Sequence, residues 1–494
     1  MDAPFITFKD ETGSTDITFR AAMESFIVIG GTGSGKTTSS SALVSTKLLK
    51  NGFGGLVLTA KSDERKLWER YAKQTGRTKD LIIVEPGGNH SFDFLHYISD
   101  RSNSKSAYAE NIVHVLTTII RASEEKSGGK QDDPFWENSQ NILIHNVIDL
   151  CLLAYGKVSV KDLYEIVMSA PKAADPNYGD PKKNAFAKAF NKAQENVDAQ
   201  VEAFNSNLTK AAEEELDTKE KFEDAVLRAL PDAATLKFLD QFFMDSYRNL
   251  SEKTRSIVEF SFTGFLFRLL KNPVHSLFCS HVNTFKPEDV FEGKIILLDL
   301  PVKLYHKVGR DIQILFKYLF QQAMEKRNID DNTKPVFIYA DEAQHFLHEY
   351  DSDFLATSRG SRIVSCYITQ NLPNLHANMG GIKSEYRVKS LLGNFGTKIF
   401  HANTDTETNN YASELFGDGY IEDISSSNTI AGDFSSSKTI SYKLERMERP
   451  EEFQFLKTGG PQNNFLVEAY VHRQGQLFHN GLPFKKVIFS QNLK

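Results

Sequence analysis

Residues 26–38 read FIVIGGTGSGKTT. The apolar, mostly β-branched run at 26–29 predicts a buried strand, and the pattern that follows the glycines predicts a helix. The loop between them matches G-x-x-x-x-G-K-[ST] in the strand-to-helix context that this pattern requires. The alternative is a chance match, which the agreement between pattern and context argues against. The stretch therefore predicts an α/β fold with a phosphate-binding loop.

The residues of this loop have distinct expected roles. Glycines let backbone N–H groups curl around a phosphate chain, and the dipole of the following helix favours negative charge there. Lys36 is expected to reach the β- and γ-phosphates, and Thr37 to offer its hydroxyl to Mg²⁺. The residues expected to contact a nucleotide are Gly30, Thr32, Gly33, Ser34, Gly35, Lys36, Thr37 and Thr38.

Further β-type runs extend the pattern outward from the loop. They lie at 55–58, 81–84, 294–300, 336–340, 363–369 and 397–401. Their alternation with helical patterns is typical of a mainly parallel sheet flanked by helices. From 108 to 275 only helical patterns occur, so we expect an inserted all-helical domain there. Residues 1–107 and 276–494 are expected to form one nucleotide-binding domain with a C-terminal hairpin.

Three other segments have weaker signals. The charged helices near the middle of the insertion are typical of a solvated face, with a dedicated binding surface as the alternative. Residues 424–441 read ISSSNTIAGDFSSSKTIS, and their serine content predicts a mobile loop. Residues 464–481 predict a terminal hairpin near the surface.

An acidic pair follows one of the predicted strands. Residues 336–344 read VFIYADEAQ, which places Asp341 and Glu342 at the carboxyl end of a strand, where parallel sheets bind ligands. Asp341 is expected to complete the Mg²⁺ shell with Thr37, and Glu342 to polarise the attacking water. A solvated carboxylate pair is the alternative, and the phosphate-binding loop upstream favours the catalytic interpretation.

Two polar residues flank the next β-type run. Gln370 ends IVSCYITQ, where its amide can hydrogen-bond the γ-phosphate or the water, although glutamine is also common at strand ends. Arg359 lies in SRGSR, just before the run, and is a candidate arginine finger for the site of a neighbouring subunit. A surface salt bridge or a contact with a phosphate backbone is an equal alternative for this arginine.

Composition excludes several classes of protein. A net charge of −6 excludes a polybasic nucleic-acid binder, and three widely spaced cysteines give neither a disulfide framework nor a zinc cluster. No apolar run reaches the roughly 18 residues of a membrane span. HFLHE at 345–349 matches no zinc motif, so no metal site is expected there. These features fit a cytoplasmic protein.

Basic residues are concentrated in one segment. Residues 356–400 contain six lysines and arginines against one acidic residue. A basic strip would suit a channel that follows a phosphate backbone, and a solvated face is the equal alternative. The basic residues are Arg359, Arg362, Lys383, Arg387, Lys389 and Lys398.

The ordered set of motifs resembles the TraG/TraD-type coupling proteins of type IV secretion, within the HerA/FtsK-like group of RecA-fold motor ATPases. The set is GGTGSGKTT, KIILLDLPVKLYHK, VFIYADEAQ, SRGSR, YITQNLPNL, LLGNFGTKIFHANTD and YASELFG, over most of the chain. The resemblance implies a RecA-like fold, ATP and Mg²⁺ as cofactors, and catalytic roles for Lys36, Glu342 and Gln370, with Arg359 acting in trans. It also implies a hexameric ring that moves DNA or a DNA-bound protein, while the helical domain docks cargo.

Two departures from the family pattern bear on these expectations. The loop begins at Gly30, which leaves no room for the transmembrane helices that usually precede it. We expect a cytosolic form, one that borrows a membrane anchor from a partner at the inner membrane, or a truncated form. TAKSDE at 59–64 stands where the family usually has an Asp-Pro-Lys-Gly-Glu-like turn, and it retains Lys61 but not the Asp and Pro.

Functions from different classes stay open at this point. The full set of Lys36, Asp341, Glu342, Gln370 and an arginine favours a DNA-translocating ATPase, because a pure binding module needs no water-activating carboxylate. The alternatives are an ATP-switched assembly protein in a cytosolic effector or phage-defence complex and a motor that acts on protein cargo.

Overall fold

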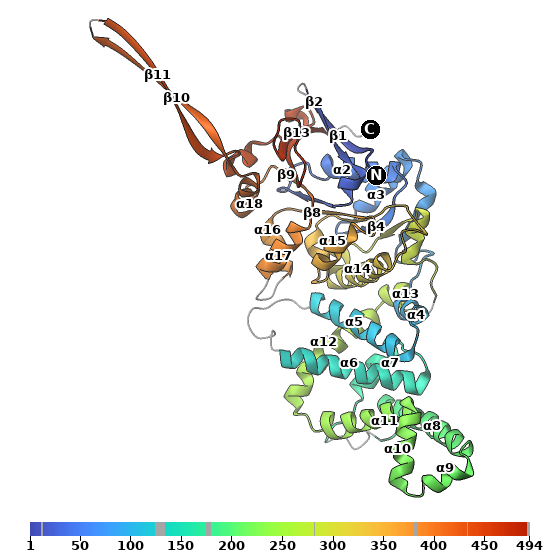
Figure 1. Ribbon diagram of the computed structural model, residues 1–494. Helices are drawn as coiled ribbons and strands as arrows, with labels where there is room; N and C mark the ends of the chain where they lie inside the picture. Colours follow the sequence, from blue (N-terminus) through green and yellow to red (C-terminus); the bar gives the residue numbers. More distant parts are fainter. Residues whose placement is uncertain are drawn as a thin grey trace. The chain divides into compact units, whose positions relative to one another are not determined.

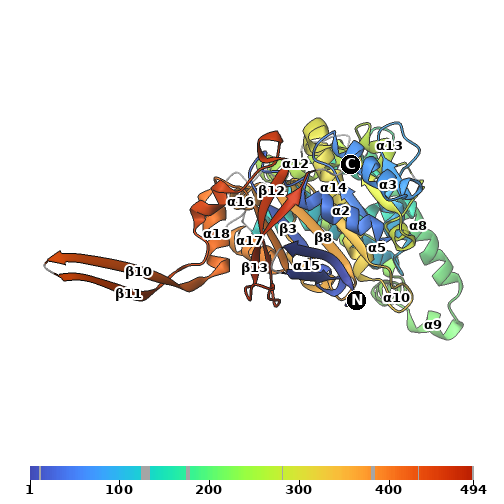
Figure 2. The same ribbon diagram turned by 90° about the horizontal axis from the view of Figure 1, so that it is seen from above.

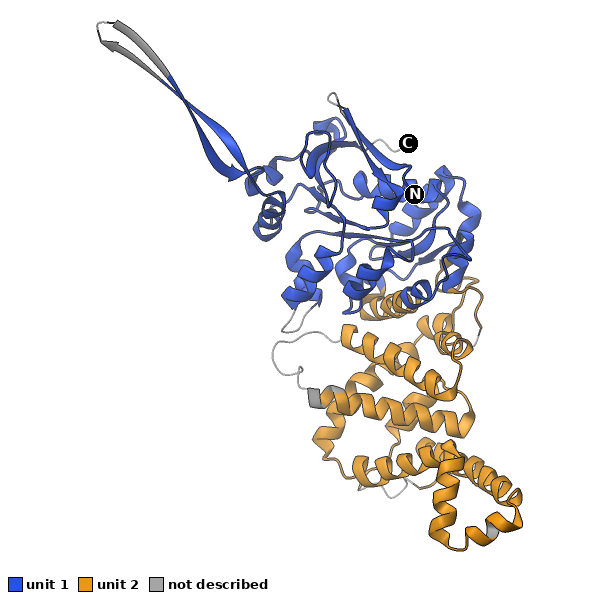
Figure 3. Ribbon diagram, in the orientation of Figure 1, with its two compact units in different colours: residues 1–82, 287–304, 320–494 blue, residues 83–286, 305–319 orange. Residues whose placement is uncertain are grey.

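The computed structural model describes residues 1–10, 13–123, 134–173, 179–280, 282–379, 384–431 and 433–491. The chain divides into two compact units (Figure 3). Unit 1 comprises Met1–Ile82, Pro287–Leu304 and Phe320–Lys494, and unit 2 comprises Ile83–Lys286 and Tyr305–Leu319. The described elements within residues 108–275 are all helical and belong to unit 2.

A nine-stranded sheet is the framework of unit 1 (Figure 1). In spatial order its strands are β13 (Phe484–Ser490), β12 (Leu466–Arg473), β9 (Thr397–His401), β3 (Phe26–Ile29), β8 (Ile363–Thr369), β7 (Val336–Ala340), β4 (Gly54–Leu58), β6 (Ile295–Leu298) and β5 (Leu81–Val84). From β9 to β6 each described pair is parallel, and β12 is antiparallel to both β9 and β13. Each predicted strand is confirmed, and so is the mainly parallel α/β fold.

Burial explains why these short apolar runs form central strands. Every residue of β3, β4, β6, β7, β8 and β9 is buried. Parallel strands covered on both faces carry continuous apolar side chains rather than an alternating pattern. Continuous runs such as FIVI and IILL therefore predict strands of this kind.

Strand order brings the predicted site residues to one edge of the sheet. β3 lies between β8 and β9, with Ile29 opposite both Thr369 and Phe400. β7 lies beside β8, with Ala340 opposite Tyr367. Because these strands are parallel, the loops that follow them emerge at the same carboxyl edge, where open α/β sheets bind ligands.

Helices connect the strands. Those of unit 1 include α2 (Ser40–Lys50), α3 (Glu64–Gln74), α15 (Asp351–Ser358), α16 (Leu372–Met379), α17 (Ser384–Gly393) and α18 (Thr406–Phe416). The helical segment α14 (Val302–Glu325), which is kinked at His306, is divided between the two units. One apolar stripe of this helix is buried and consists of Ile312, Leu315, Phe316, Leu319 and Ala323.

The segment predicted as a mobile loop forms a two-stranded ribbon instead. Its strands are β10 (Asp418–Ala431) and β11 (Asp433–Arg446), which pair only with each other and extend beyond α18 (Figure 2). The loop prediction for 424–441 is wrong because the serines conceal a period of two. Tyr420 pairs with Leu444 and Ile424 with Ile440, and this spacing places all four side chains on one face of the ribbon.

The segment predicted as a terminal hairpin, 464–481, contains β12 but not its hairpin partner β13, which begins at Phe484. The prediction that this segment lies near the surface is wrong for β12. β12 pairs with β9 inside the large sheet, and seven of its eight residues are buried. The second strand, β13, forms the edge of the sheet. Glu468, His472 and Arg473 give β12 the polar content of a surface strand, yet all three are buried.

An N-terminal hairpin precedes the sheet and was not predicted. It consists of β1 (Pro4–Asp10) and β2 (Gly13–Thr18), followed by α1 (Phe19–Ala22). The ring of Phe5 lies 5.4 Å from that of Phe19 and 6.1 Å from that of Phe53. These aromatic contacts attach the hairpin to unit 1.

Unit 2 is helical. Its helices include α4 (Phe94–Asp100), α5 (Lys105–Ser123), α6 (Pro134–Tyr155), α7 (Val160–Met168), α8 (Ala185–Ser206), α9 (Lys210–Glu215), α10 (Lys219–Ala229), α11 (Pro231–Asp240), η2 (Gln241–Tyr247), α12 (Glu252–Leu269) and α13 (Val274–Phe278). In the described ranges no single helix is long and apolar enough to cross a membrane. The bent pair Asn138–Tyr155 and Val160–Met168 meets the requirement jointly, by length and composition only.

Candidate nucleotide-binding and catalytic site

The phosphate-binding loop joins β3 to α2. Gly33 and Gly35 have positive φ angles of 76° and 84°, a backbone conformation that residues with a side chain rarely adopt. A Cβ atom at Gly35 would lie 2.6 Å from Cγ2 of Val467, so a side chain has no space there either. The loop can therefore turn tightly enough to present backbone N–H groups to an anion.

Lys36 folds back over this loop. Its Nζ donates a hydrogen bond to the carbonyl oxygen of Gly31 at 2.9 Å and another to that of Gly30. The residue is 9% exposed. Burial lowers the pKa of Lys36, and the charges of Asp341 and Glu342 oppose that shift. The ammonium lies where it can neutralise a phosphate held by the loop.

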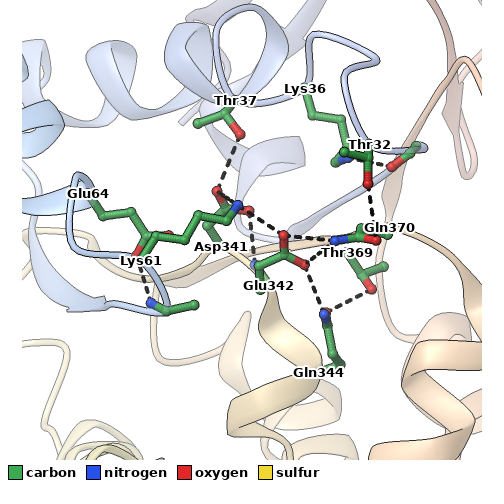
Figure 4. Close-up of polar contacts among 12 residues, drawn as sticks. Thr32, Lys36, Thr37, Lys61, Glu64, Asp341, Glu342, Gln344, Thr369 and Gln370 are labelled. Carbon is green, nitrogen blue, oxygen red and sulfur yellow. Dashed lines mark hydrogen bonds and ion pairs between the residues drawn. The ribbon is translucent and has the colours of Figure 1, made fainter. Parts of the chain in front are cut away.

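Asp341 follows β7 and faces the start of α2. Its Oδ2 accepts a hydrogen bond from the Thr37 hydroxyl at 3.3 Å, and its Oδ1 accepts one from the backbone N–H of Glu342 at 2.9 Å (Figure 4). Carboxylate and hydroxyl oxygens are the ligands that Mg²⁺ prefers. Thr37 and Asp341 therefore fit a hard divalent cation.

Glu342 has an uncommon backbone conformation and several hydrogen bonds. Its φ and ψ of 51° and 49° lie in the left-handed region. Its Oε2 accepts from Gln344 Nε2 at 2.9 Å, and Gln370 Nε2 donates to Oε1 at 3.0 Å and to Oε2 at 3.2 Å. Lys61 Nζ lies 2.9 Å from Oε1. Burial opposes ionisation, but these donors together lower the pKa of Glu342 to about 2.

Gln370 connects the loop to this carboxylate. Its Oε1 accepts a hydrogen bond from the Thr32 hydroxyl at 3.4 Å, while its Nε2 donates to Glu342 (Figure 4). Its backbone carbonyl accepts from Asn403 Nδ2 at 2.9 Å. Gln370 thus contacts Thr32 of the phosphate-binding loop and also Glu342, the carboxylate expected to polarise the attacking water.

These residues surround one cavity of about 480 Å³ within unit 1. Its lining consists of Thr32, Gly33, Ser34, Gly35, Lys36, Thr37, Thr38, Lys61, Lys303, Asp341, Glu342, Gln370 and Gln491. Of the predicted site residues, Gly30 and Arg359 are not part of this lining. Gly30 lies directly behind it, because its carbonyl accepts from Lys36.

Arg359 lies at the other edge of the sheet. It follows α15 and forms an ion pair with Glu24 at 2.9 Å, and its side chain is 56% exposed. Glu24 comes before β3, whereas the phosphate-binding loop comes after it, so Arg359 is at the amino ends of the parallel strands. The structure does not bring this arginine to the cavity of its own chain. Its role in a neighbouring subunit stays a prediction.

The predicted basic strip is not one exposed surface. Lys398 is buried and donates to the carbonyl of Phe395 at 2.6 Å, and burial, followed by the charge of Arg473, lowers its pKa to about 8. Arg387 pairs with Glu349 at 2.8 Å. Lys383 lies outside the described residues. The strip prediction is therefore wrong for Lys398, because a local charge count does not distinguish strand residues from loop residues.

Lys61 and Gln344 also contribute to the site, in roles that the sequence patterns did not predict. Lys61 follows β4 and reaches both Asp341 and Glu342. Gln344 is fixed by the Thr369 hydroxyl, which donates to its Oε1 at 3.0 Å. The position of Gln344 two residues after Glu342 was a local signal for its role. The role of Lys61 depends on β4 being adjacent to β7, which the sequence does not show.

Comparisons with known proteins show the family and the fold of this chain. A family model described as "Type IV secretory system Conjugative DNA transfer" matches residues 7–458. The chain belongs to this family. The resemblance to TraG/TraD-type coupling proteins is thereby confirmed. A search of curated protein sequences found no match.

Solved structures of the plasmid coupling protein TrwB have the same fold as this conjugative-transfer family member. TrwB with the non-hydrolysable GTP analogue GDPNP gives a TM-score of 0.58 at 14% identity, over 100% of this chain and 98% of the solved TrwB chain. TrwB with ADP and Mg²⁺ gives a TM-score of 0.55 at 13% identity, over 100% of this chain and 96% of the solved chain. The unbound monoclinic form of TrwB gives a TM-score of 0.57 at 14% identity, over 96% of this chain and 88% of the solved chain. These likenesses confirm the RecA-like fold.

Proposed function

We propose that this protein is an ATP-hydrolysing motor that works as a hexameric ring and translocates DNA or a DNA–protein substrate. The observation that carries the proposal is the convergence of Lys36, Thr37, Asp341, Glu342 and Gln370 on one cavity. Together these groups supply what phosphoryl transfer requires of a protein, namely positioning and stabilisation of charge. TrwB solved with ADP and Mg²⁺ supports ATP and Mg²⁺ as the cofactors of this chain.

The residues divide the work of hydrolysis among them. Lys36 and the loop amides would bind the phosphates. Thr37 and Asp341 would hold Mg²⁺, which would supply positive charge to neutralise the charge that develops. The oxygen of a water molecule forms a bond to the γ-phosphorus, while the bond from that phosphorus to the bridging oxygen breaks. The electrons of the broken bond stay with ADP, and Glu342 accepts the water proton before passing it to phosphate or solvent.

The ring and the DNA substrate rest on separate support. Membership of the conjugative DNA transfer family favours DNA as the substrate. The exposed position of Arg359, at the sheet edge opposite the cavity, suits an arginine finger that acts on a neighbouring subunit. In this proposal the protein works in the cytoplasm, contacts the inner membrane through a partner, and binds cargo with its helical unit.

The test is ATP turnover of the full chain with and without single- and double-stranded DNA, at low and moderate salt. The matched variant is Glu342→Gln, which keeps the size of the side chain but removes its basicity. DNA stimulation that weakens as salt rises and disappears in the variant supports the motor. Turnover indifferent to DNA would instead indicate protein cargo. ATP binding with negligible turnover would indicate the alternative assembly switch.

A further inference from the structure

Lys61 reaches the catalytic carboxylates from a neighbouring strand. β4 pairs in parallel with β7, with Leu58 opposite Ala340, so the loop after β4 lies beside Asp341 and Glu342. Lys61 Nζ is 2.9 Å from Glu342 Oε1 and 3.6 Å from Asp341 Oδ2 (Figure 4). Its side chain is 31% exposed and lines the cavity. Lys36 and Lys303 also line this cavity.

The loop that carries Lys61 is held firmly at its base. Glu64, at the start of α3, is buried, and its Oε2 accepts the backbone N–H of Ala60 at 2.8 Å. This contact closes the turn on both sides of Lys61. The backbone is therefore fixed, while the partly exposed side chain can move between partners within the cavity.

Lys36 and Lys61 have different partners. Lys36 donates to two backbone carbonyls of its own loop and lies over the place where phosphate would bind. Lys61 instead forms ion pairs with both carboxylates. The Lys61 ammonium stabilises the ionised carboxylate of Glu342. It also occupies Oε1, an oxygen that could otherwise accept a hydrogen bond from the attacking water.

The carboxylate of Glu342 has no spare acceptor position in this arrangement. Oε1 accepts from Lys61 and Gln370, and Oε2 accepts from Gln344 and Gln370. A carboxylate has about four lone-pair sites, so these contacts use its capacity. Glu342 can bind the attacking water only after one of the donors leaves.

We propose that Lys61 is a positioning residue that moves between two anions, the Glu342 carboxylate and the γ-phosphate of bound ATP. This inference rests on the proposed ATP binding. The γ-phosphate draws the ammonium away from Glu342, which frees Oε1 to accept a hydrogen bond from the attacking water. ADP has no γ-phosphate, so it leaves Lys61 paired with Glu342. Lys61 thereby makes the availability of the catalytic carboxylate depend on the third phosphate.

The proposal predicts how affinity for nucleotide depends on the third phosphate. Binding of the full chain to the ATP analogue AMPPNP and to ADP, each with Mg²⁺, is measured by calorimetry. Lys61→Ala should weaken AMPPNP binding about tenfold, the value of a charge-assisted hydrogen bond, while ADP binding changes less than about twofold. Lys61→Arg should recover most of the loss. Lys66→Ala, the same change at an exposed position of α3, should alter neither affinity.

A double-mutant cycle tests the exchange itself. Glu342→Gln removes the ion pair that AMPPNP must break, so this variant should bind AMPPNP more tightly than the native chain, by about threefold to tenfold. The gain should vanish when Lys61→Ala is added. A merely structural role of Lys61 would not produce this dependence of one substitution on the other.

The outcomes separate this inference from the proposed function. If the native chain binds neither nucleotide, the proposed function fails. If it binds both but Lys61→Ala weakens them equally, or if the Glu342→Gln gain persists without Lys61, the exchange is overturned while the ATPase proposal stands. Thermal melting of each variant shows whether a lost affinity reflects lost folding, and Lys61→Arg keeps the test decisive if the alanine variant is unstable.

Discussion

Acid should destabilise unit 1 through His401, the last residue of β9. The side chain is 1% exposed, and its Nε2 lies 2.7 Å from the Ser40 hydroxyl of α2. No described group is a partner for its Nδ1. Burial, with the charge of Lys36 as a smaller cause, lowers the pKa of His401 from 6.5 to about 3. Between about pH 3 and pH 6.5 the imidazole is therefore neutral in the folded protein and protonated in the unfolded chain.

The sign and size of the effect follow from that difference. The folded pKa is the lower one, so stability is complete above about pH 6.5 and is lost progressively as the pH falls towards 3. Each pH unit in this window is worth about 1.36 kcal/mol. Between pH 7 and pH 5 the free energy of unfolding should fall by about 2 kcal/mol from His401 alone. That is a large part of the roughly 5–15 kcal/mol of a typical domain.

Urea unfolding at pH 7 and pH 5, followed by tryptophan fluorescence, measures this loss, because Trp68 is buried in unit 1. The control is His401→Gln, which keeps an amide near Ser40 but does not titrate. Other titrating groups contribute equally to the pH dependence of both proteins, so their effects cancel in the difference. One of them is His472, because burial lowers its pKa to about 4. The variant should lose about 2 kcal/mol less than the native chain over this range. Equal losses in the two proteins would refute the reasoning.

Three further predictions concern the site. Glu342→Gln should reduce turnover by about 10²- to 10⁴-fold without weakening ATP binding, measured as phosphate release and nucleotide affinity; unchanged turnover would remove Glu342 from the mechanism. Thr37→Ala removes one oxygen ligand, so the Mg²⁺ concentration for half-maximal turnover should rise about tenfold in a Mg²⁺ titration, and an unchanged requirement would exclude this ligand. Gly35→Ala should lower the free energy of unfolding by about 1–3 kcal/mol and abolish ATP binding. The added Cβ would lie 2.6 Å from Val467, on a backbone with a φ of +84°. A stable variant that binds ATP would contradict this.

Sequence patterns predict the centre of this protein well because several independent rules agree there. The apolar runs at 26–29 and before Asp341 each predict a strand. The glycines after the first run predict the phosphate-binding loop, and Asp341 and Glu342 follow the second run. Parallel strands bring their carboxyl ends to one edge. Lys36, Asp341, Glu342 and Gln370 therefore meet in space for a reason that local patterns already contain.

Other features depend on contacts between distant parts of the chain. The pairing of Lys61 with Glu342 requires β4 beside β7, and strand order is not a local property of sequence. In the ribbon β10–β11, serine composition conceals the alternation of Ile440, Tyr442 and Leu444 with polar residues. In β12 the polar residue Glu468 is buried because lysines and a backbone amide compensate its charge. Composition alone predicts the wrong environment in each case.

Glu342 shows how a functional site can oppose local preferences. A left-handed backbone is unfavourable by about 1–2 kcal/mol for a residue with a side chain, and glycine or asparagine would adopt it more readily. Here Gln344 and Gln370 hold the carboxylate, and the strained turn directs it towards the phosphate-binding loop rather than into solvent. Substitution by glycine would relieve the backbone but remove the group that can accept a proton. The strain is therefore a consequence of placing a carboxylate at this position, and the residues after β7 are better explained by chemistry than by stability.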